Sequence, residues 1–135
     1  MKKNINAIYL ALIGTLFAGF GLGYLFFPTL LIEQSGMLIP SASAKADAWA
    51  MYAGIQVGFG LFLILCANDS SLRRAGLLSI IFIFGGIAVA RTLGVLYFQS
   101  YDAFNVSALC IEWPGTLVAI YLYKKNVADS AKSNI

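Results

Sequence analysis

The chain has 135 residues, of which 60% are hydrophobic and 11% are charged, and its formal net charge is +3. Soluble domains are roughly 45–50% apolar and about 25% charged, so this composition indicates an integral membrane protein with room for one domain, residues 1–135. Its basic residues stand mostly at the ends of apolar runs and form no cluster on a soluble surface, which argues against nucleic-acid binding. We therefore expect an all-α protein whose surroundings are membrane lipid.

The first apolar run covers residues 5–27 and follows a short basic leader with Lys2 and Lys3. Signal peptides have an apolar stretch of only about 7–15 residues, and the small-residue triplet at 42–44 lies too far downstream to be a cleavage site for this run. We predict that it is a retained transmembrane helix, ended by Pro28 because proline cannot continue the helical hydrogen bonding.

The segment at residues 29–46 has apolar clusters that are interrupted by Gly36 and Pro40. It is too short and too broken to cross a bilayer, so we expect it to lie along the membrane interface. Ser41 or Ser43 is expected to cap the helix that follows, because a serine oxygen accepts hydrogen bonds from the free amides of a first turn.

Three more apolar runs are each near the ~20 residues that a bilayer requires. They cover residues 44–67, 75–98 and 104–123, and a polar tail follows at 126–135. Together with the first run they predict a bundle of four membrane-spanning helices.

The basic residues are distributed unequally between the two predicted sides of the membrane. One side has Lys2, Lys3, Arg73, Arg74, Lys124, Lys125 and Lys132, and the loops of the other have only Lys45, beside Glu33, Asp47 and Asp102. Cytoplasmic loops are enriched in Lys and Arg. We therefore predict a multi-pass membrane protein with both termini in the cytoplasm, and in a Gram-negative bacterium this membrane would be the bacterial inner membrane.

Small residues recur at a spacing of four in three predicted helices. The repeats are Gly19 and Gly23, Gly54 and Gly58, and Gly86, Ala90 and Gly94. Such spacing lets helix backbones approach closely, although glycine is also simply common in membrane helices. If these residues pack, they serve equally well inside one bundle or between copies of the chain in a homo-oligomer, and the pattern does not separate the two.

Two opposite charges stand inside the last two apolar runs. Arg91 is about seven residues from the end of one predicted helix and Glu112 about eight from the start of the next, so at ~1.5 Å per residue both are roughly 10–12 Å below the same membrane face. An unpaired charge in hydrocarbon costs at least ~2.5–3.5 kcal/mol. We therefore predict a buried Arg91–Glu112 pair in the outer half of the membrane.

Three further polar side chains are predicted to gather near this pair. By helical phase and depth, Tyr52 is level with the pair, Gln56 is one turn deeper, and Asn105 is two turns above Glu112 near the mouth. The candidate ligand-binding residues are Arg91, Glu112, Gln56, Tyr52 and Asn105. A purely structural ion-pair network and a ligand or transport site both remain open.

The sequence offers no catalytic, metal or cofactor set. It has no histidine, and its two cysteines, Cys66 and Cys110, are predicted too far apart to form a disulfide. No nucleophile stands with a partner base. Trp113, beside Glu112, is expected to be a packing residue.

The segment at residues 47–60 reads DAWAMYAGIQVGFG, and it is followed by ARTLG at residues 90–94 and by Glu112. This pattern, which is most specific at 47–60, resembles a bacterial domain-of-unknown-function family of small four-span membrane proteins. The resemblance covers nearly the whole chain and implies the four-span architecture. It also implies a basic residue at position 49 and often a glycine at position 53, where this chain has Trp49 and Ala53. It implies no activity.

Three functional classes follow from these observations. The first is a structural or interaction module that binds a partner, a lipid or another ligand. The second is a subunit of a small-solute transporter or exporter, which would need a hydrated site. The third is a membrane enzyme acting on a lipid or quinone, with Glu112 as acid and base.

Overall fold

The computed structural model of this protein describes residues 5–28, 36, 38 and 41–133. All regular structure in these ranges is helical, which confirms the all-α prediction. Four helices are long and apolar enough to cross a membrane, judged by length and composition. They are α1 (Ile5–Phe26), the helix Ala42–Asn68, α5 (Arg73–Phe98) and the Ala103–Ala128 part of α6 (Ala103–Ser133).

The helix ends differ from the prediction in two places. α6 continues to Ser133, where the sequence predicted a polar tail from residue 126. The tail contains good helix formers such as Ala128 and Lys132, so a long helix that is already nucleated can extend through it into water. The interfacial segment predicted at 29–46 lies mostly outside the described residues, and Ala42 to Ala46 already belong to the next helix.

The chain divides into two compact units, residues 1–70 and residues 71–135. The single domain expected from the composition stays a prediction. Each unit contains two of the four long helices.

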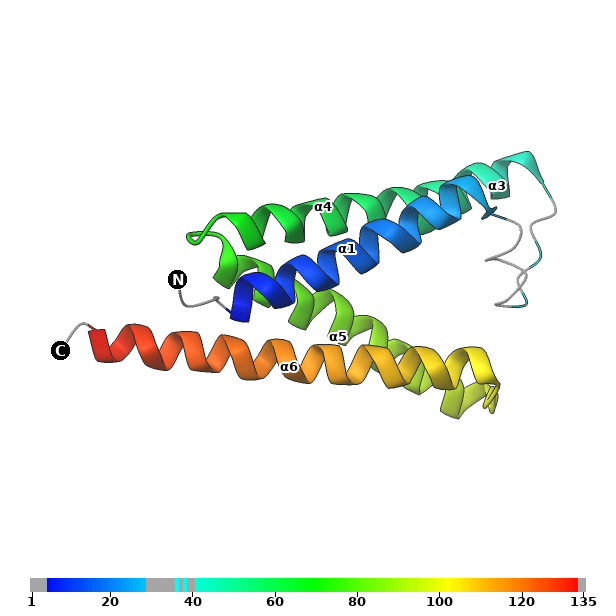
Figure 1. The fold of residues 1–135 in the computed structure, drawn as a ribbon. Helices are drawn as coiled ribbons and strands as arrows, with labels where there is room; N and C mark the ends of the chain where they lie inside the picture. Colours follow the sequence, from blue (N-terminus) through cyan, green and yellow to red (C-terminus); the bar gives the residue numbers. More distant parts are fainter. Residues whose placement is uncertain (1–4, 29–35, 37, 39–40, 134–135) are drawn as a thin grey trace. The chain divides into compact units, whose positions relative to one another are not determined.

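In the first unit, α1 lies alongside a long helix with a wide turn in its course (Figure 1). This helix consists of α3 (Ala42–Ala48), the π-helical segment η1 (Trp49–Gly54) and α4 (Ile55–Asn68). Ser41 caps its start, as predicted, by accepting a hydrogen bond of 3.1 Å from the amide of Ala44. In the wide turn, the Ile55 amide bonds to the Ala50 carbonyl, five residues back.

The backbones of α1 and α4 touch at glycines. A Cβ atom at Gly60 would lie 2.5 Å from the amide nitrogen of Ala18 and 2.6 Å from the carbonyl oxygen of Gly14. A Cβ at Gly21 would lie 2.9 Å from the carbonyl oxygen of Ala53. Since no side chain fits in these places, glycine is what permits the close approach.

Aromatic contacts flank this approach. The rings of Phe17 and Phe59 meet edge to face with centroids 4.9 Å apart, and Tyr24 stacks on Tyr52 with centroids 5.4 Å apart. Tyr52 and Gly60 therefore both face α1.

Within the first unit, three glycines of the small-residue repeats lie away from the contact between the helices. A Cβ at Gly19 or Gly58 would meet no atom within 4 Å, and one at Gly54 would meet only an atom of its own helix. The faces that do pack carry Gly14, Gly21 and Gly60, which the four-residue spacing passed over. Use of Gly19, Gly23, Gly54 and Gly58 between copies of the chain stays a prediction.

In the second unit, α5 and α6 form an antiparallel hairpin (Figure 1). A Cβ at Gly115 would lie 2.6 Å from the ring of Phe84, and one at Gly85 would lie 3.0 Å from Thr116 Cγ2. Gly86 and Gly94 again have open space beside them. The predicted stripe on α5 is therefore one residue away from the face that meets α6.

The two ends of the hairpin are closed by different contacts. At one end, Gln99 adopts a left-handed backbone (φ 54°, ψ 35°) that stops α5, and Asp102 caps α6 through a 3.0 Å hydrogen bond from the Asn105 amide. At the other end, Arg74 donates to the Tyr123 hydroxyl at 3.0 Å and lies over its ring, 5.2 Å from the centroid.

Candidate ligand-binding site

The predicted ion pair is present in the hairpin. Arg91 Nε of α5 donates to both carboxylate oxygens of Glu112 on α6, at 2.9 and 3.1 Å. The Glu112 side chain is 7% exposed and the Arg91 side chain 25% exposed. The pairing and the burial of Glu112 are confirmed, and one partner of the pair keeps an accessible edge.

Asn105 links this pair to the loop of the hairpin. Its Oδ1 accepts from Arg91 Nη1 at 3.2 Å, while its Nδ2 donates to Asp102 Oδ2 at 2.7 Å and to Ser100 Oγ at 2.9 Å. Ser100 Oγ in turn donates to Asp102 Oδ2 at 2.7 Å. A continuous polar chain thus runs from Glu112 through Arg91 and Asn105 to Asp102. We call these four residues and Ser100 the Arg91 network.

Asp102 stays ionised in this network. The hydrogen bonds from the Asn105 amide, the Ser100 hydroxyl and the Asn105 side chain lower its pKa from 3.8 to about 2. Each of these donors favours the charged carboxylate over the neutral acid. The loop end of the hairpin therefore carries a second fixed negative charge besides Glu112.

The local sequence explains why these groups meet. α5 ends in the left-handed turn at Gln99, so the chain reverses within a few residues and Ser100 comes to lie beside the first turn of α6. Aspartate is a preferred N-cap, and capping by Asp102 fixes the first turn of α6, which contains Asn105. Asn105 and Glu112 are seven residues apart on α6, two turns along one face.

Arg91 has more donors than the network uses. A guanidinium carries five N–H bonds, of which the network takes one on Nε and one on Nη1, so 5 − 2 leaves three. No described residue is paired with Nη2. Among the described residues no fully buried side-chain nitrogen or oxygen lacks a partner, so Nη2 must be accessible. The ring of Phe104 lies 5.6 Å from the guanidinium carbon and covers another side of it.

The accessible side of Arg91 faces an open hollow of about 590 Å³. Small-molecule sites are commonly ~300–1,000 Å³ and mostly apolar with a few polar groups. The hollow fits this description, since its lining residues are Ile87, Ala90, Arg91, Gly94, Val95, Phe98, Ser100 and Asn105.

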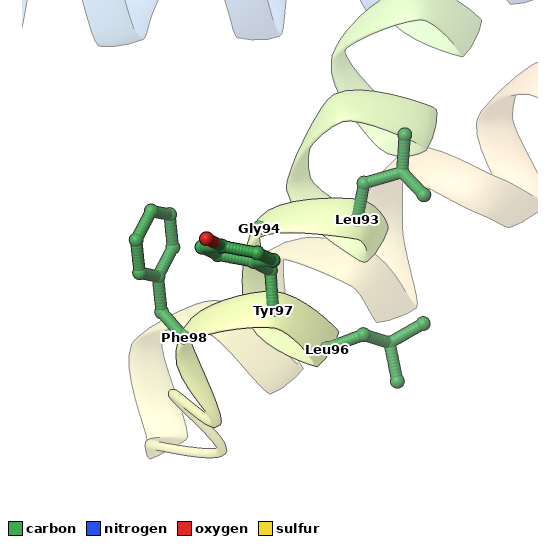
Figure 2. A pocket seen from close by; sticks show the side chains of 5 residues that line it. All are labelled: Leu93, Gly94, Leu96, Tyr97 and Phe98. Atoms are coloured by element: carbon green, nitrogen blue, oxygen red, sulfur yellow. The ribbon is translucent and has the colours of Figure 1, made fainter.

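A second hollow of about 540 Å³ adjoins the first along α5, and Figure 2 shows the side chains that line this second hollow. It shares Gly94 and Phe98 with the first and is otherwise lined by Leu93, Leu96 and Tyr97. The rings of Tyr97 and Phe98 meet edge to face beside Gly94, and the side chains of Leu93 and Leu96 point away from them. It is a hollow in the surface of one helix and is entirely apolar in its side chains apart from the Tyr97 hydroxyl.

The remaining predicted site residues belong to the first unit. Tyr52 is in η1, where its ring stacks on Tyr24, and Gln56 is half-buried near the start of α4. The structure brings together Arg91, Glu112 and Asn105 within the second unit. The convergence of Tyr52 and Gln56 with Arg91 stays a prediction.

Sequence reasoning missed two members of the Arg91 network and one further hydrogen bond across the hairpin. Ser100 and Asp102 lie in the loop, where helical periodicity says nothing about side-chain direction. Trp113, expected to be a packing residue, donates through Nε1 to Thr92 Oγ1 at 3.1 Å, and Thr92 donates to the Ala88 carbonyl at 2.7 Å. Thr92 and Trp113 directly follow Arg91 and Glu112, but in an antiparallel hairpin a step forward on one helix corresponds to a step back on the other, so the sequence offered no signal for this pair.

The described part of the chain shows no group of three or more His, Cys, Asp or Glu residues placed to hold a metal ion. Cys66 is buried and Cys110 is exposed, and neither forms a disulfide. The chemistry that this site offers is hydrogen bonding from a positioned guanidinium.

Comparison with known proteins gives one finding. A family model described as Domain of unknown function (DUF4345) matches residues 5–123. No curated protein and no solved structure matches the chain.

Proposed function

The chain belongs to the DUF4345 family, a domain of unknown function, and from the geometry of its own residues we propose that it is a membrane protein that binds a ligand in the hollow beside Arg91. The observation that carries this proposal is that some N–H groups of one guanidinium bond to the protein and others do not. Nε and one N–H of Nη1 donate to Glu112 and Asn105, while Nη2 has no partner among the described residues and is accessible.

A purely structural ion pair would not need this arrangement. A carboxylate and one edge of a guanidinium already neutralise each other. In an apolar setting, the lowest free energy is then reached when the other donors bond to acceptors within the protein. Here, instead, the Asn105 bridge turns Arg91 so that its other edge lines a hollow. Arginine is suited to this double role because its planar fork offers donors on more than one side.

Gly94 provides the sharpest test. It lines both hollows, and a Cβ there would meet nothing within 4 Å, so Gly94→Leu places a bulky side chain in the ligand space without a clash at its Cβ. Gly86 is the matched control, since it is on the same helix, has equally open space and lines neither hollow.

The measurement is thermal unfolding of the purified chain in detergent, with and without a total membrane lipid extract. A ligand that binds only the folded state raises its Tm. We expect the extract to raise the Tm of the wild type and of Gly86→Leu, and to leave that of Gly94→Leu unchanged. Equal shifts of Tm in all three proteins, or no shift in any, would mean that the Arg91 network stabilises the fold and binds no ligand.

We further propose that both termini face the cytoplasm of a bacterial cell and that the Arg91 network lies in the half of the inner membrane away from it. Support comes from the hairpin, where the Arg74–Tyr123 contact groups Arg73, Arg74, Lys124 and Lys125 at the end opposite Asp102. Reporter fusions after residue 125 and within the loop at 99–102 should read opposite sides of the membrane. A cytoplasmic signal from the loop fusion would reverse the orientation.

A further inference from the structure

The polar atoms around the hollow restrict what a ligand can offer. Both N–H bonds of Asn105 Nδ2 are directed to Ser100 and Asp102, and the Ser100 hydroxyl donates to Asp102. The unused donors of the network are therefore those of Arg91. A ligand that pairs with them must bring a hydrogen-bond acceptor.

The charge around the hollow restricts the ligand further. Between residues 87 and 116 the charged side chains are Arg91, Asp102 and Glu112, so one guanidinium is set against two carboxylates. Asp102 remains ionised because its three hydrogen-bond donors lower its pKa to about 2. An anionic acceptor would add a third negative charge to this group, and like charges repel, more weakly from Asp102 because it is exposed to solvent and does not line the hollow. The network thus offers donors but disfavours anions.

The apolar part of the lining favours a ligand with a long apolar body. Polar groups stand at one end of the hollow, at Arg91, Ser100 and Asn105, and the remaining lining residues are apolar. The lining continues past Gly94 into the second hollow, where the side chains of Tyr97 and Phe98 are 81% and 74% exposed (Figure 2). Such exposed aromatic residues at the end of a membrane helix gain from contact with apolar chains.

On the basis of the proposed function, we infer that the ligand is an uncharged lipid whose carbonyl oxygen accepts hydrogen bonds from Arg91 and whose apolar chain lies along α5 over Gly94. Ester carbonyls of glycerolipids and ring carbonyls of isoprenoid quinones share this chemistry. No covalent or redox step is part of the proposal.

The test compares probes that differ in one property each. Methyl oleate has a neutral carbonyl, oleate has the same chain with a carboxylate, and 1-octadecene has an apolar chain without an acceptor. Binding to the full-length chain in non-ionic detergent is measured by native mass spectrometry at about pH 9, where the oleate carboxyl is ionised. We expect methyl oleate to bind roughly tenfold more tightly than oleate, the effect of one unfavourable charge at a partly wet site, and 1-octadecene to bind more weakly than methyl oleate.

Asp102→Asn removes one carboxylate. Asparagine is as good an N-cap as aspartate, so the start of α6 is preserved, but its NH2 group cannot accept the hydrogen bonds that Ser100 and Asn105 donate to Asp102 Oδ2. The preference for methyl oleate over oleate should then fall, although by less than tenfold, because Asp102 is exposed and water screens its charge. A decyl-substituted benzoquinone is the second neutral probe, and its affinity relative to methyl oleate tells which source of carbonyl the hollow fits better.

The outcomes separate this inference from the proposed function. If oleate binds as tightly as methyl oleate or more tightly, and Gly94→Leu abolishes that binding while Gly86→Leu does not, the hollow binds ligands but the uncharged class is wrong. If 1-octadecene matches methyl oleate in the same Gly94-dependent way, the carbonyl contact is wrong. If Gly94→Leu changes the binding of no probe, the proposed binding site itself is refuted.

Discussion

The two units of this protein hold their pairs of helices together by different kinds of contact. Between α1 and α4 the closest contacts are backbone to backbone, at Gly14, Gly21 and Gly60. Between α5 and α6, side chains cross the interface with hydrogen bonds, at Arg91–Glu112 and Thr92–Trp113. In lipid no hydrophobic force drives helices together, so close packing and interhelical hydrogen bonds are the two devices available.

The difference teaches where chemistry can be placed in a small membrane protein. A glycine contact leaves no surface free for a ligand, because the two backbones occupy all the space between them. A polar contact can leave part of a polar group unused, as Arg91 does with the donors that line the hollow. The glycine pair therefore suits a scaffold, and the polar pair suits a site.

The largest expected effect comes from breaking the polar pair on one side. Arg91→Ala leaves Glu112 as a buried charge without its partner, and Glu112→Ala does the same to Arg91. Each change should cost about 3–5 kcal/mol of unfolding free energy at full burial, and less for Glu112→Ala because Arg91 is partly exposed. Unfolding in detergent by a denaturing surfactant measures these values.

The double variant Arg91→Ala/Glu112→Ala is the control for that cycle. It removes both charges at once, so much of the lost stability should return. Additive losses in the double variant would show that the two charges do not stabilise each other.

The glycine contact should be broken by a single methyl group. In Gly60→Ala the added Cβ would meet backbone atoms of Ala18 and Gly14 that cannot rotate away, so α1 and α4 must separate. We expect a loss of roughly 1–3 kcal/mol, as for other overpacked cores. Gly58→Ala, two residues away with open space around it, should be neutral or slightly stabilising in the same unfolding assay. Equal behaviour of the two variants would contradict the described approach of the helices.

The smallest expected effect concerns the neutral hydrogen bond next to the ion pair. Thr92→Val keeps the shape of the side chain and removes the acceptor for Trp113 Nε1. Interhelical hydrogen bonds in membrane proteins contribute about 0.6 kcal/mol on average, with a maximum near ~1.7. Ser107→Ala, whose hydroxyl bonds only within its own helix, should change the stability by less than Thr92→Val in a side-by-side measurement. A larger loss of stability from Ser107→Ala would show that the Trp113–Thr92 hydrogen bond does not stabilise the protein.

The sequence predicted the ion pair and one further member of its network. Arg91 and Glu112 were recognisable because a charge in a long apolar run needs a partner, and the short loop placed both at one depth. Asn105 followed from Glu112 by helical phase. Ser100 and Asp102 could not be found in this way, because their positions depend on the left-handed turn at Gln99, a conformation that only a few per cent of non-glycine residues adopt.

The packed glycines were harder to predict than the charges. The four-residue spacing selected Gly86 and Gly94 on α5, whereas the residue that meets α6 is Gly85. Glycine has no side chain whose chemistry demands a partner, so a pattern of small residues shows that an approach is allowed and does not show where it occurs. A charge in lipid costs several kcal/mol if left alone, and that cost is what makes its partner predictable.

The wide turn at η1 has a consequence for how the sequence of this helix relates to its faces. A π-helical turn holds one more residue than an α-helical turn, so Trp49–Gly54 acts like a one-residue insertion in an otherwise regular helix. Each residue of an α-helix advances the direction by about 100°, so a regular α-helix of the same length would rotate Ala42–Ala48 by that angle relative to Ile55–Asn68. A relative of this protein that lacks the wide turn should align with a one-residue gap within positions 49–54, and only with that gap would its residues before and after the turn keep their faces.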